Sequence, residues 1–450
     1  MDPFQDYVNR NRERFLAELQ DFCRQPSVAA QNLGMQAMAH KVLARLSQLG
    51  AEARLVEVGD GAPIVYAEIG SGLRTLMIYN HYDVQPAEPL DLWESGPWEA
   101  AIREGKVYAR GVADNKGNLM NRIQAVEAYL AAIGPLPIKI KFVAEGEEEI
   151  GSVHLTQFVR DNLTLLQSVD GCLWEFGGKD INERPELWCG LKGDVYVELH
   201  AHGAKRDLHS AYAAIVGDPA WRLTWALATL KDADERILID DFMDHVRPPT
   251  AAEMEALKSI PFDDEKEKAE LGIPAFVNNL SGLDLVKKYL YEPTCTICGL
   301  YSGYIGPGSK TVLPNHAFAK IDFRLVPDLS PELVLELLRK HLARRGFDDI
   351  EVKLIETGLE VARSPLDSAI VRAATEAARA VYPNEPVVYP TSAGSGPMYT
   401  LCQALGIPAV SAGCGWHDSR GHAPNENIRI ADYFEGMQFI RELMDRFAAT

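Results

Sequence analysis

Short apolar segments alternate with helical segments along much of the chain, and this alternation constrains the fold more than any other feature. From about residue 63 onward, strand-like runs read "IVYAEIG", "TLMIYN", "PIKIKFVAE" and "GCLWEFG", with the helical "GNLMNRIQAVEAYLAAIG" among them. Near the C-terminus the same order returns in "SAIVRAATEAARAVY", "IPAVSAGCG" and "ADYFEGMQFIRELMDRF". These segments predict an α/β domain with a mostly parallel central sheet and helices on both faces.

The texture changes near Gly193, where a second kind of pattern begins. Strand patterns occur at 194–202, 293–303, 315–327 and 349–358, and helical patterns at 219–232 and 330–346, the last with Ser330 as its N-cap. The order β-α-β-β-α-β is that of a ferredoxin-like α+β domain. Because 450 residues exceed one ordinary core, we expect one domain formed by 1–193 and 362–450, with a ferredoxin-like domain inserted at 194–361.

Composition excludes several classes of function. The net charge of −19 argues against nucleic-acid binding, which needs a basic surface. No segment approaches the ~18 consecutive apolar residues of a membrane span, and the first 25 residues predict an amphipathic helix and no secretion signal. The seven cysteines are odd in number and show no disulfide framework, so we expect a reducing, cytoplasmic location.

Acidic and imidazole side chains follow several of the predicted strands. In open parallel sheets, ligands bind beyond the carboxyl ends of the strands. The residues found there are His81, Asp83, Asp114, Glu145, Glu147, Glu148, Glu149, Glu175, His417, Asp418 and His422. Carboxylates gathered in one crevice repel each other unless a cation compensates them. Two histidines with several carboxylates are the ligands of a pair of divalent ions, Zn²⁺ or Mn²⁺, with a spare carboxylate as the base.

Each of these features also has a simpler interpretation when taken alone. A His-x-Asp pair is common on surfaces, a run of glutamates is often a polar loop, and His209 in "RDLHSA" is by itself a loop histidine. The lone pair Cys295 and Cys298 falls inside a predicted strand, which favours strand cysteines over a zinc finger. The coincidence across separate strand ends favours the metal centre.

Four motifs together resemble the M20 family of metallopeptidases, in its branch of dipeptidases. They are "YNHYDVQP", "GVADNKG", "EGEEEIGS" and "GHAPNE", with further matches at "RDLHSA", "SKTVLP", "DFRLVP" and "AGSGP". The resemblance covers essentially the whole chain. It implies that the inserted domain serves as a lid and a dimerisation domain.

The resemblance also implies roles for individual residues. His81 and Glu175 would hold one metal ion, Glu149 and His422 the other, and Asp114 would bridge both, while Asp83 would orient His81. Glu148 would be the general base that activates a metal-bridging water. His209 would reach into the partner subunit's site to stabilise the oxyanion, which implies a homodimer. The substrate's terminal carboxylate would contact Thr311, Arg324 and Ser395.

Two positions depart from the common pattern of the family. Asn115 stands where many relatives have a second aspartate, and the family's cis peptide at this bond is expected to persist. Glu175 stands where relatives often have aspartate; because both carboxylates bind metal, we expect a changed metal preference and not a lost site.

The function predicted from these residues is hydrolysis of the peptide bond of dipeptides or short peptides with a free C-terminal carboxylate. An N-acyl amino acid deacylase on the same scaffold is the alternative, because amide cleavage beside a carboxylate needs the same parts. A non-catalytic binding homologue is a further alternative, against which the intact ligands and Glu148 argue. The roles of Glu145 and Glu147 stay open.

Overall fold

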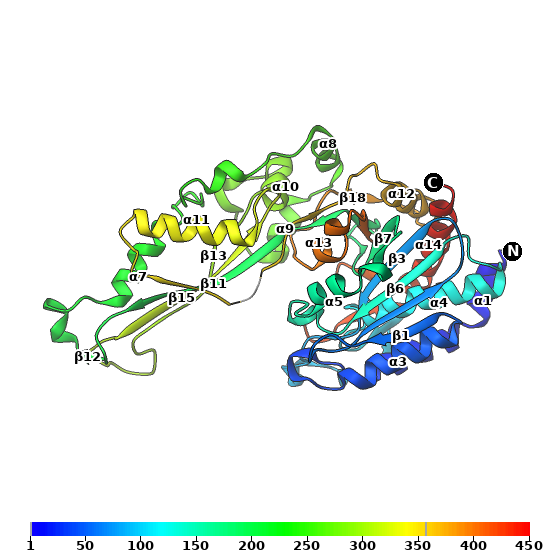
Figure 1. The fold of residues 1–450 in the computed structure, drawn as a ribbon, viewed down its shortest axis with the longest axis horizontal. Coiled ribbons are helices and arrows are strands. Elements are labelled where there is room, and N and C mark those ends of the chain that lie inside the picture. The colour runs from blue at the N-terminus through cyan, green and yellow to red at the C-terminus, as the bar shows by residue number, and fades with distance from the viewer. Residues whose placement is uncertain (1, 356–357) are drawn as a thin grey trace. The chain divides into compact units, whose positions relative to one another are not determined.

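The chain divides into two compact units in a computed structural model that describes residues 2–355 and 358–450 (Figure 1). The first unit consists of Met1–Gly190, Arg363–Pro390 and Pro397–Thr450, and the second of Leu191–Ala362 and Thr391–Gly396. The short segment Thr391–Gly396 therefore belongs with the second unit, although the sequence pattern gives no sign of it.

An eight-stranded sheet forms the centre of the first unit. Its strand order is β1 (Glu52–Val56), β2 (Ile64–Ile69), β6 (Lys139–Glu145), β3 (Thr75–His81), β7 (Gly171–Trp174), β19 (Ala409–Ser411), β9 (Glu186–Trp188) and β18 (Val387–Tyr389). The inner strands β6, β3, β7 and β19 run parallel, whereas β1 and β2 are antiparallel additions at one edge. The prediction of an α/β fold with a mainly parallel central sheet is confirmed.

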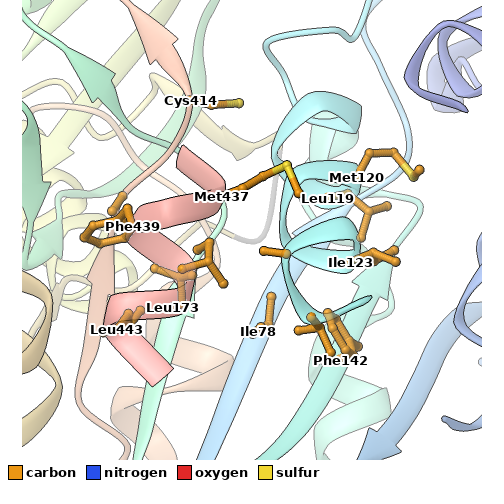
Figure 2. Packing of buried hydrophobic residues seen from close by; sticks show 14 of the residues in the cluster. Ile78, Leu119, Met120, Ile123, Phe142, Leu173, Cys414, Met437, Phe439 and Leu443 are labelled. Carbon is orange, nitrogen blue, oxygen red and sulfur yellow. The ribbon is translucent and has the colours of Figure 1, made fainter. Parts of the chain in front are cut away.

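Helices cover both faces of this sheet. On one face, apolar side chains of α4 (Lys116–Ala132) and α14 (Ile430–Ala448) pack with those of β3, β6 and β7, as Figure 2 shows for residues such as Ile123, Met437 and Leu443. On the other face, the ammonium of Lys141 on β6 donates to the carbonyls of Leu165 and Gln167, at 2.7 Å each, at the end of α6 (Leu163–Leu166). Alternate residues of one strand thus contact different helical layers.

The remaining helices of the first unit complete these layers. They are α1 (Pro3–Arg10), α2 (Arg12–Arg24), α3 (Met35–Gln48), α5 (Leu155–Asp161), α12 (Ala369–Val381) and α13 (Met398–Leu401). A small sheet of β21 (Asn427–Arg429), β5 (Lys106–Tyr108) and β4 (Ala101–Arg103) lies outside the central sheet. Every helix of the described residues is too short or too polar to cross a membrane.

The second unit is built on a four-stranded antiparallel sheet. Its strand order is β13 (Thr296–Ser302), β15 (His316–Leu325), β11 (Gly193–His202) and β16 (Glu351–Leu354). The helices that follow β11 and β15 are α7 (Pro219–Leu227) and α11 (Pro331–Arg344). This is the ferredoxin-like order predicted from the sequence, and the hydroxyl of Ser330 caps α11 by accepting from the Leu333 amide at 3.2 Å. Residues 356 and 357 of the predicted last strand lie outside the described residues.

Three further helices lie in the long connection between α7 and β13. They are α8 (Ala251–Ser259), α9 (Asp264–Leu271) and α10 (Gly282–Tyr291). A capping box begins α8, because Thr250 and Glu253 each accept from the other's amide. The charged segment 261–272, predicted to be a solvated helix or loop, contains α9, none of whose residues is buried.

Candidate metal centre

The acidic residues gather where parallel strands β3 and β6 end side by side. Their register pairs His81, the last residue of β3, with Glu145, the last residue of β6. The short helix η3 (Glu148–Ile150) follows β6, and Gly151 ends it with a φ of 86°, a left-handed conformation that glycine adopts without strain. Glu148 and Glu149 therefore lie in a tight turn directly after the end of β6.

Asp114 lies between two histidines that are distant in the sequence. One of its carboxylate oxygens, Oδ1, is 3.0 Å from Nε2 of His81, and the other, Oδ2, is 3.0 Å from Nε2 of His422. Burial opposes ionisation of Asp114, but its hydrogen bonds to both imidazoles hold the pKa of this carboxyl well below its usual range. A carboxylate with each oxygen facing a different imidazole has the geometry of a bridging ligand.

Glu149 completes this cluster. Its Oε2 is 3.2 Å from Nε2 of His422 and accepts from Nε2 of Gln85 at 2.8 Å. The other oxygen, Oε1, is buried and has no hydrogen-bond partner among the described residues. Ligand atoms of His81, Asp114 and Glu149 all lie within 4.8 Å of one another. Because buried carboxylate oxygens need a partner, this donor set fits a divalent cation.

Asp83 supports the cluster from below. Its buried carboxylate is 3.3 Å from Nδ1 of His81 and accepts from the backbone amides of Glu148 and Glu149, at 3.3 and 3.0 Å. The predicted contact with His81 is therefore present. The same carboxylate also fixes the start of η3, which sequence reasoning missed.

Glu148 lies in a low-dielectric and strongly acidic environment. Burial raises the pKa of its carboxyl well above the ordinary value, and the nearby carboxylates of Glu175, Asp114 and Glu149 raise it further, against the opposing effect of His81. A carboxyl with a raised pKa is suited to accept and return a proton near neutral pH.

Glu175 follows β7 and lies above a buried guanidinium. Burial raises the pKa of Glu175 to about 8, although His81 and Arg122 oppose the shift. Arg122 of α4 donates to main-chain carbonyls at the ends of three strands: Tyr79 at 2.8 Å, Trp174, and Ala412 at 2.9 Å. The arginine thereby holds the carboxyl ends of β3, β7 and β19 together.

The structure gives the other two glutamates of this segment a place. Glu145 is buried and accepts hydrogen bonds from the hydroxyls of Tyr79 and Ser152. Glu147 accepts from the Ala62 amide at 3.1 Å and contacts Nδ1 of His154 at 2.8 Å. Both side chains therefore bind the protein around η3, and neither belongs to the group of possible metal ligands.

Glu426, within the motif "GHAPNE", is a buried carboxylate that sequence reasoning missed. It accepts from Nη1 of Arg110 at 2.7 Å and from the backbone amides of Gly111, Ala113 and Asp114, at 2.9, 2.8 and 3.0 Å. These bonds fix the loop that presents Asp114. The only sequence signal is that Glu426 ends a motif containing the predicted ligand His422.

Three further expectations about this region have mixed outcomes. The Asp114–Asn115 peptide bond is cis, as predicted. Asp114 follows β5 of the small outer sheet and directly precedes α4, so it does not come from an end of the central sheet. His417 is exposed and stacks edge-on against Trp416, while Asp418 pairs with Arg420; neither joins the group of possible metal ligands.

The remaining predicted residues lie in the second unit, at two ends of its sheet. Nη1 of Arg324 donates to the Ser395 hydroxyl at 2.8 Å, and Nε of Arg324 contacts Asp322 at 3.1 Å. His209 belongs to the short strand β12 (Leu208–His209), which pairs with β14 (Val312–Leu313) directly after Thr311. The structure thus brings Arg324 together with Ser395, and His209 alongside Thr311.

These two pairs are far apart along strand β15. The eight residue-to-residue steps from His316 to Arg324 span about 27 Å at ~3.4 Å per residue, and β14 ends shortly before His316. The predicted set of Thr311, Arg324 and Ser395 is therefore divided between the two ends of the unit.

Comparisons with known proteins identify the relatives of this chain. The model of Peptidase family M20/M25/M40 matches residues 77–446. The chain is 28% identical to Beta-Ala-His dipeptidase of Rattus norvegicus, covering 96% of this chain and 92% of the relative. It is 29% identical to Cys-Gly metallodipeptidase DUG1 of Saccharomyces cerevisiae, covering 86% and 82%.

A solved structure is similar over nearly its whole length. The M20 family metallo-carboxypeptidase Sso-CP2 from Sulfolobus solfataricus has a TM-score of 0.92 and 40% sequence identity, with 97% of this chain and 99% of that chain covered. The family model covers most of the chain, and the similarity to the two dipeptidases extends over most of their own length. The chain therefore belongs to Peptidase family M20/M25/M40 and is a metal-dependent peptidase.

Proposed function

We propose that this peptidase hydrolyses the peptide bond of dipeptides or short peptides that carry a free C-terminal carboxylate. The observation that carries the proposal is Asp114, whose two oxygens each face a different histidine, with Glu149 beside them. Dipeptidases among the full-length relatives support the substrate class. The similarity to the metallo-carboxypeptidase Sso-CP2 extends it to peptides cleaved from the carboxyl end.

We propose that the site holds two divalent ions, Zn²⁺ or Mn²⁺. His81 and Glu175 would hold one ion, Glu149 and His422 the other, and Asp114 would bridge them. When bound, such ions polarise a carbonyl oxygen and lower the pKa of a water molecule. The free Oε1 of Glu149 and the separate imidazole at each Asp114 oxygen support this assignment.

Glu148 moves the proton in the proposed reaction. Its carboxylate takes a proton from the attacking water and delivers it to the leaving amine. The raised pKa of Glu148 supports this role, because burial makes the carboxyl a stronger proton acceptor than an ordinary glutamate. Asp83 keeps Glu148 in place through the amides at the start of η3.

Arg324 and Ser395 are proposed to bind the terminal carboxylate of the substrate. A guanidinium pairs with a carboxylate through parallel hydrogen bonds. Ser395 orients the arginine, since its hydroxyl accepts from Nη1 while it donates to the Gly193 carbonyl at 3.1 Å.

We propose that the enzyme is a homodimer in which His209 serves the site of the partner subunit and stabilises the oxyanion there. A dipeptide is at most ~7 Å long, and Arg324 lies about 27 Å along β15 from the end near His209. One substrate therefore cannot contact both residues of the same subunit. Thr311, which adjoins β14, goes with His209 in this arrangement.

Substrate preference tests the activity. Ala-Ala, carnosine-type dipeptides and a tripeptide are compared with N-acetyl and N-succinyl amino acids under Mn²⁺ and under Zn²⁺. We expect kcat/KM to be larger for the peptides. A larger kcat/KM for the acylated amino acids would replace the proposal with an N-acyl amino acid deacylase.

Replacement of Glu148 tests the mechanism. Glu148→Gln keeps the size of the side chain but cannot carry the proton, so kcat should fall ~10²–10⁴-fold while the metal content is unchanged. Glu52→Gln, at an exposed position on β1, is the control and should retain full activity. Equal activity of Glu148→Gln and the wild type would exclude the mechanism.

Mixing two inactive subunits tests the shared site. A His209→Ala chain mixed with a His81→Ala chain forms hybrid dimers in which one site has every residue. Partial recovery of activity is expected, and the absence of recovery in verified hybrids would contradict a role for His209 in the partner's site.

We propose a cytoplasmic location, supported by seven free cysteines of which six are buried.

A further inference from the structure

Four buried side chains form a hydrogen-bonded row beneath the metal centre. Nη1 of Arg122 donates to Oδ1 of Asn80 at 3.0 Å, and Nδ2 of Asn80 donates to Oδ1 of Asn115. Nδ2 of Asn115 then donates to Oε2 of Glu175 at 2.9 Å. Asn80 and Asn115 are completely buried, and Arg122 is 1% exposed, so water cannot replace any of these bonds.

The direction of the row is fixed at the arginine. A guanidinium only donates hydrogen bonds, so the oxygen of Asn80 must face Arg122 and its NH₂ group must face Asn115. The oxygen of Asn115 therefore faces Asn80, and its NH₂ group faces the carboxylate of Glu175. Each amide has one orientation that satisfies both neighbours.

The amide of Asn115 also holds the main chain of its partner. The same Nδ2 lies 3.0 Å from the carbonyl oxygen of Glu175 and 2.9 Å from its carboxylate. Two contacts from one donor restrict both the backbone and the side chain of Glu175. An aspartate at position 175 would be one C–C bond shorter, so its carboxylate would withdraw by ~1.5 Å from the amide.

We infer that Asn115 is a positioning residue that orients the carboxylate of Glu175 for metal binding, and that Asn115 and Glu175 act as a matched pair. An aspartate at position 115 could accept from Asn80 but could not donate to Glu175, and would place two carboxylates against each other. The residues at these two positions thus have one physical explanation. The inference rests on the proposed metal centre.

Metal affinity tests the inference without peptide hydrolysis. Metal-free wild type and variants are titrated with Mn²⁺ and with Zn²⁺ in competition with a chromogenic chelator. Asn115→Asp and Asn115→Ala should each weaken one of the two bound ions ~10–100-fold, the effect of removing a partner of a metal ligand, and leave the other ion within about threefold. A general loss of structure would weaken both ions.

Asn121→Ala is the matched control. Asn121 is a buried asparagine on α4, the helix that begins directly after Asn115, and it donates to the Tyr433 carbonyl. The Asn121→Ala variant should have a lower melting temperature and bind both metal ions with affinities within about threefold of the wild type. Because Asn115→Asp preserves the shape of the side chain, it remains informative if Asn115→Ala fails to fold.

Two results would overturn the inference. In the first, Asn115→Asp binds both ions as tightly as the wild type while Glu175→Gln loses one. In the second, the wild type binds neither ion, which overturns the proposed metal centre as well. A wild type that binds both ions but cleaves no dipeptide would contradict only the proposed substrate, and the effect of Asn115 on affinity would still be measured.

Discussion

Replacement of Glu426 by glutamine should destabilise the first unit strongly, because this carboxylate pairs with the buried Arg110 and accepts hydrogen bonds from the loop 111–114. Each of its oxygens accepts two hydrogen bonds: Oε2 from Arg110 and the Gly111 amide, Oε1 from the Ala113 and Asp114 amides. Glutamine retains one oxygen, so two buried donors would face an NH₂ group. Arg110 would also lose its charge partner, and both side chains are 1% exposed.

The magnitude follows from these contacts. Two buried donors without partners cost about 1–3 kcal/mol each, and breaking one partner of a buried ion pair costs about 3–5 kcal/mol. These estimates describe overlapping effects and do not add, so we expect Glu426→Gln to lose about 3–5 kcal/mol in the free energy of unfolding. Activity should fall as well, because the same bonds position Asp114.

A double-mutant cycle in urea measures the effect. Burial raises the pKa of Glu426, although Arg110 opposes the shift. The attraction between the two side chains therefore offsets only part of the cost of burying the carboxylate. Arg110→Met with Glu426→Gln should therefore be more stable than Glu426→Gln alone. A loss below about 1 kcal/mol in Glu426→Gln, or a double variant no more stable than the single one, would refute the reasoning.

Three further outcomes follow from particular contacts. Removal of bound metal by a chelator should lower the melting temperature by about 5–10 °C, since an ion at 100 times its Kd contributes about 2.7 kcal/mol. Adding Mn²⁺ or Zn²⁺ should restore the melting temperature. An unchanged melting temperature after chelation would argue against the metal centre. Gly146→Ala places a Cβ 2.4 Å from the Tyr82 hydroxyl, which donates to the Pro63 carbonyl at 2.6 Å. We expect this variant to lose about 1–3 kcal/mol in the free energy of unfolding, measured by calorimetry. Gly217→Ala is the control, because its added Cβ meets nothing within 4 Å. Burial raises the pKa of Glu186 from 4.5 to about 7, so between these pH values the folded state binds a proton that the unfolded state has lost. The free energy of unfolding should therefore fall as the pH rises from 4.5 to about 7, and Glu186→Gln should remove about 2 kcal/mol of this decrease. An unaltered pH dependence of stability in the variant would contradict this prediction.

The order of elements was predictable because each depends on neighbouring residues. Periodicity within β11, α11 and β15 is local, and so is the cap at Ser330, so the ferredoxin-like order could be derived before any contact was known. The position of acidic residues after strands was equally accessible, since parallel strands end at a common edge.

The support around the site was not predictable in the same way. Glu426 binds Arg110 across 316 positions, and Asn115 binds Glu175 across 60. No periodicity links such pairs. Thr311 illustrates the same limit, because its motif lies close in sequence to Arg324 while strand β15 carries the two to opposite ends of the sheet.

Buried cations explain why the acidic cluster still requires metal. Arg122 and Lys116 both lie within α4 beneath the cluster, yet they donate chiefly to main-chain carbonyls: Arg122 to Tyr79 and Ala412, and Lys116 to Gln25 at 2.6 Å. Burial lowers the pKa of Lys116 to about 8, which further reduces the positive charge it offers. The carboxylates of Asp114 and Glu149 therefore face His81 and His422, with the side-chain amide of Gln85 beside Glu149. From the charges in the sequence alone, Arg122 and Lys116 would be expected to pair with the acidic cluster. In the structure they bind main-chain carbonyls, so the carboxylates stay available to bind metal ions.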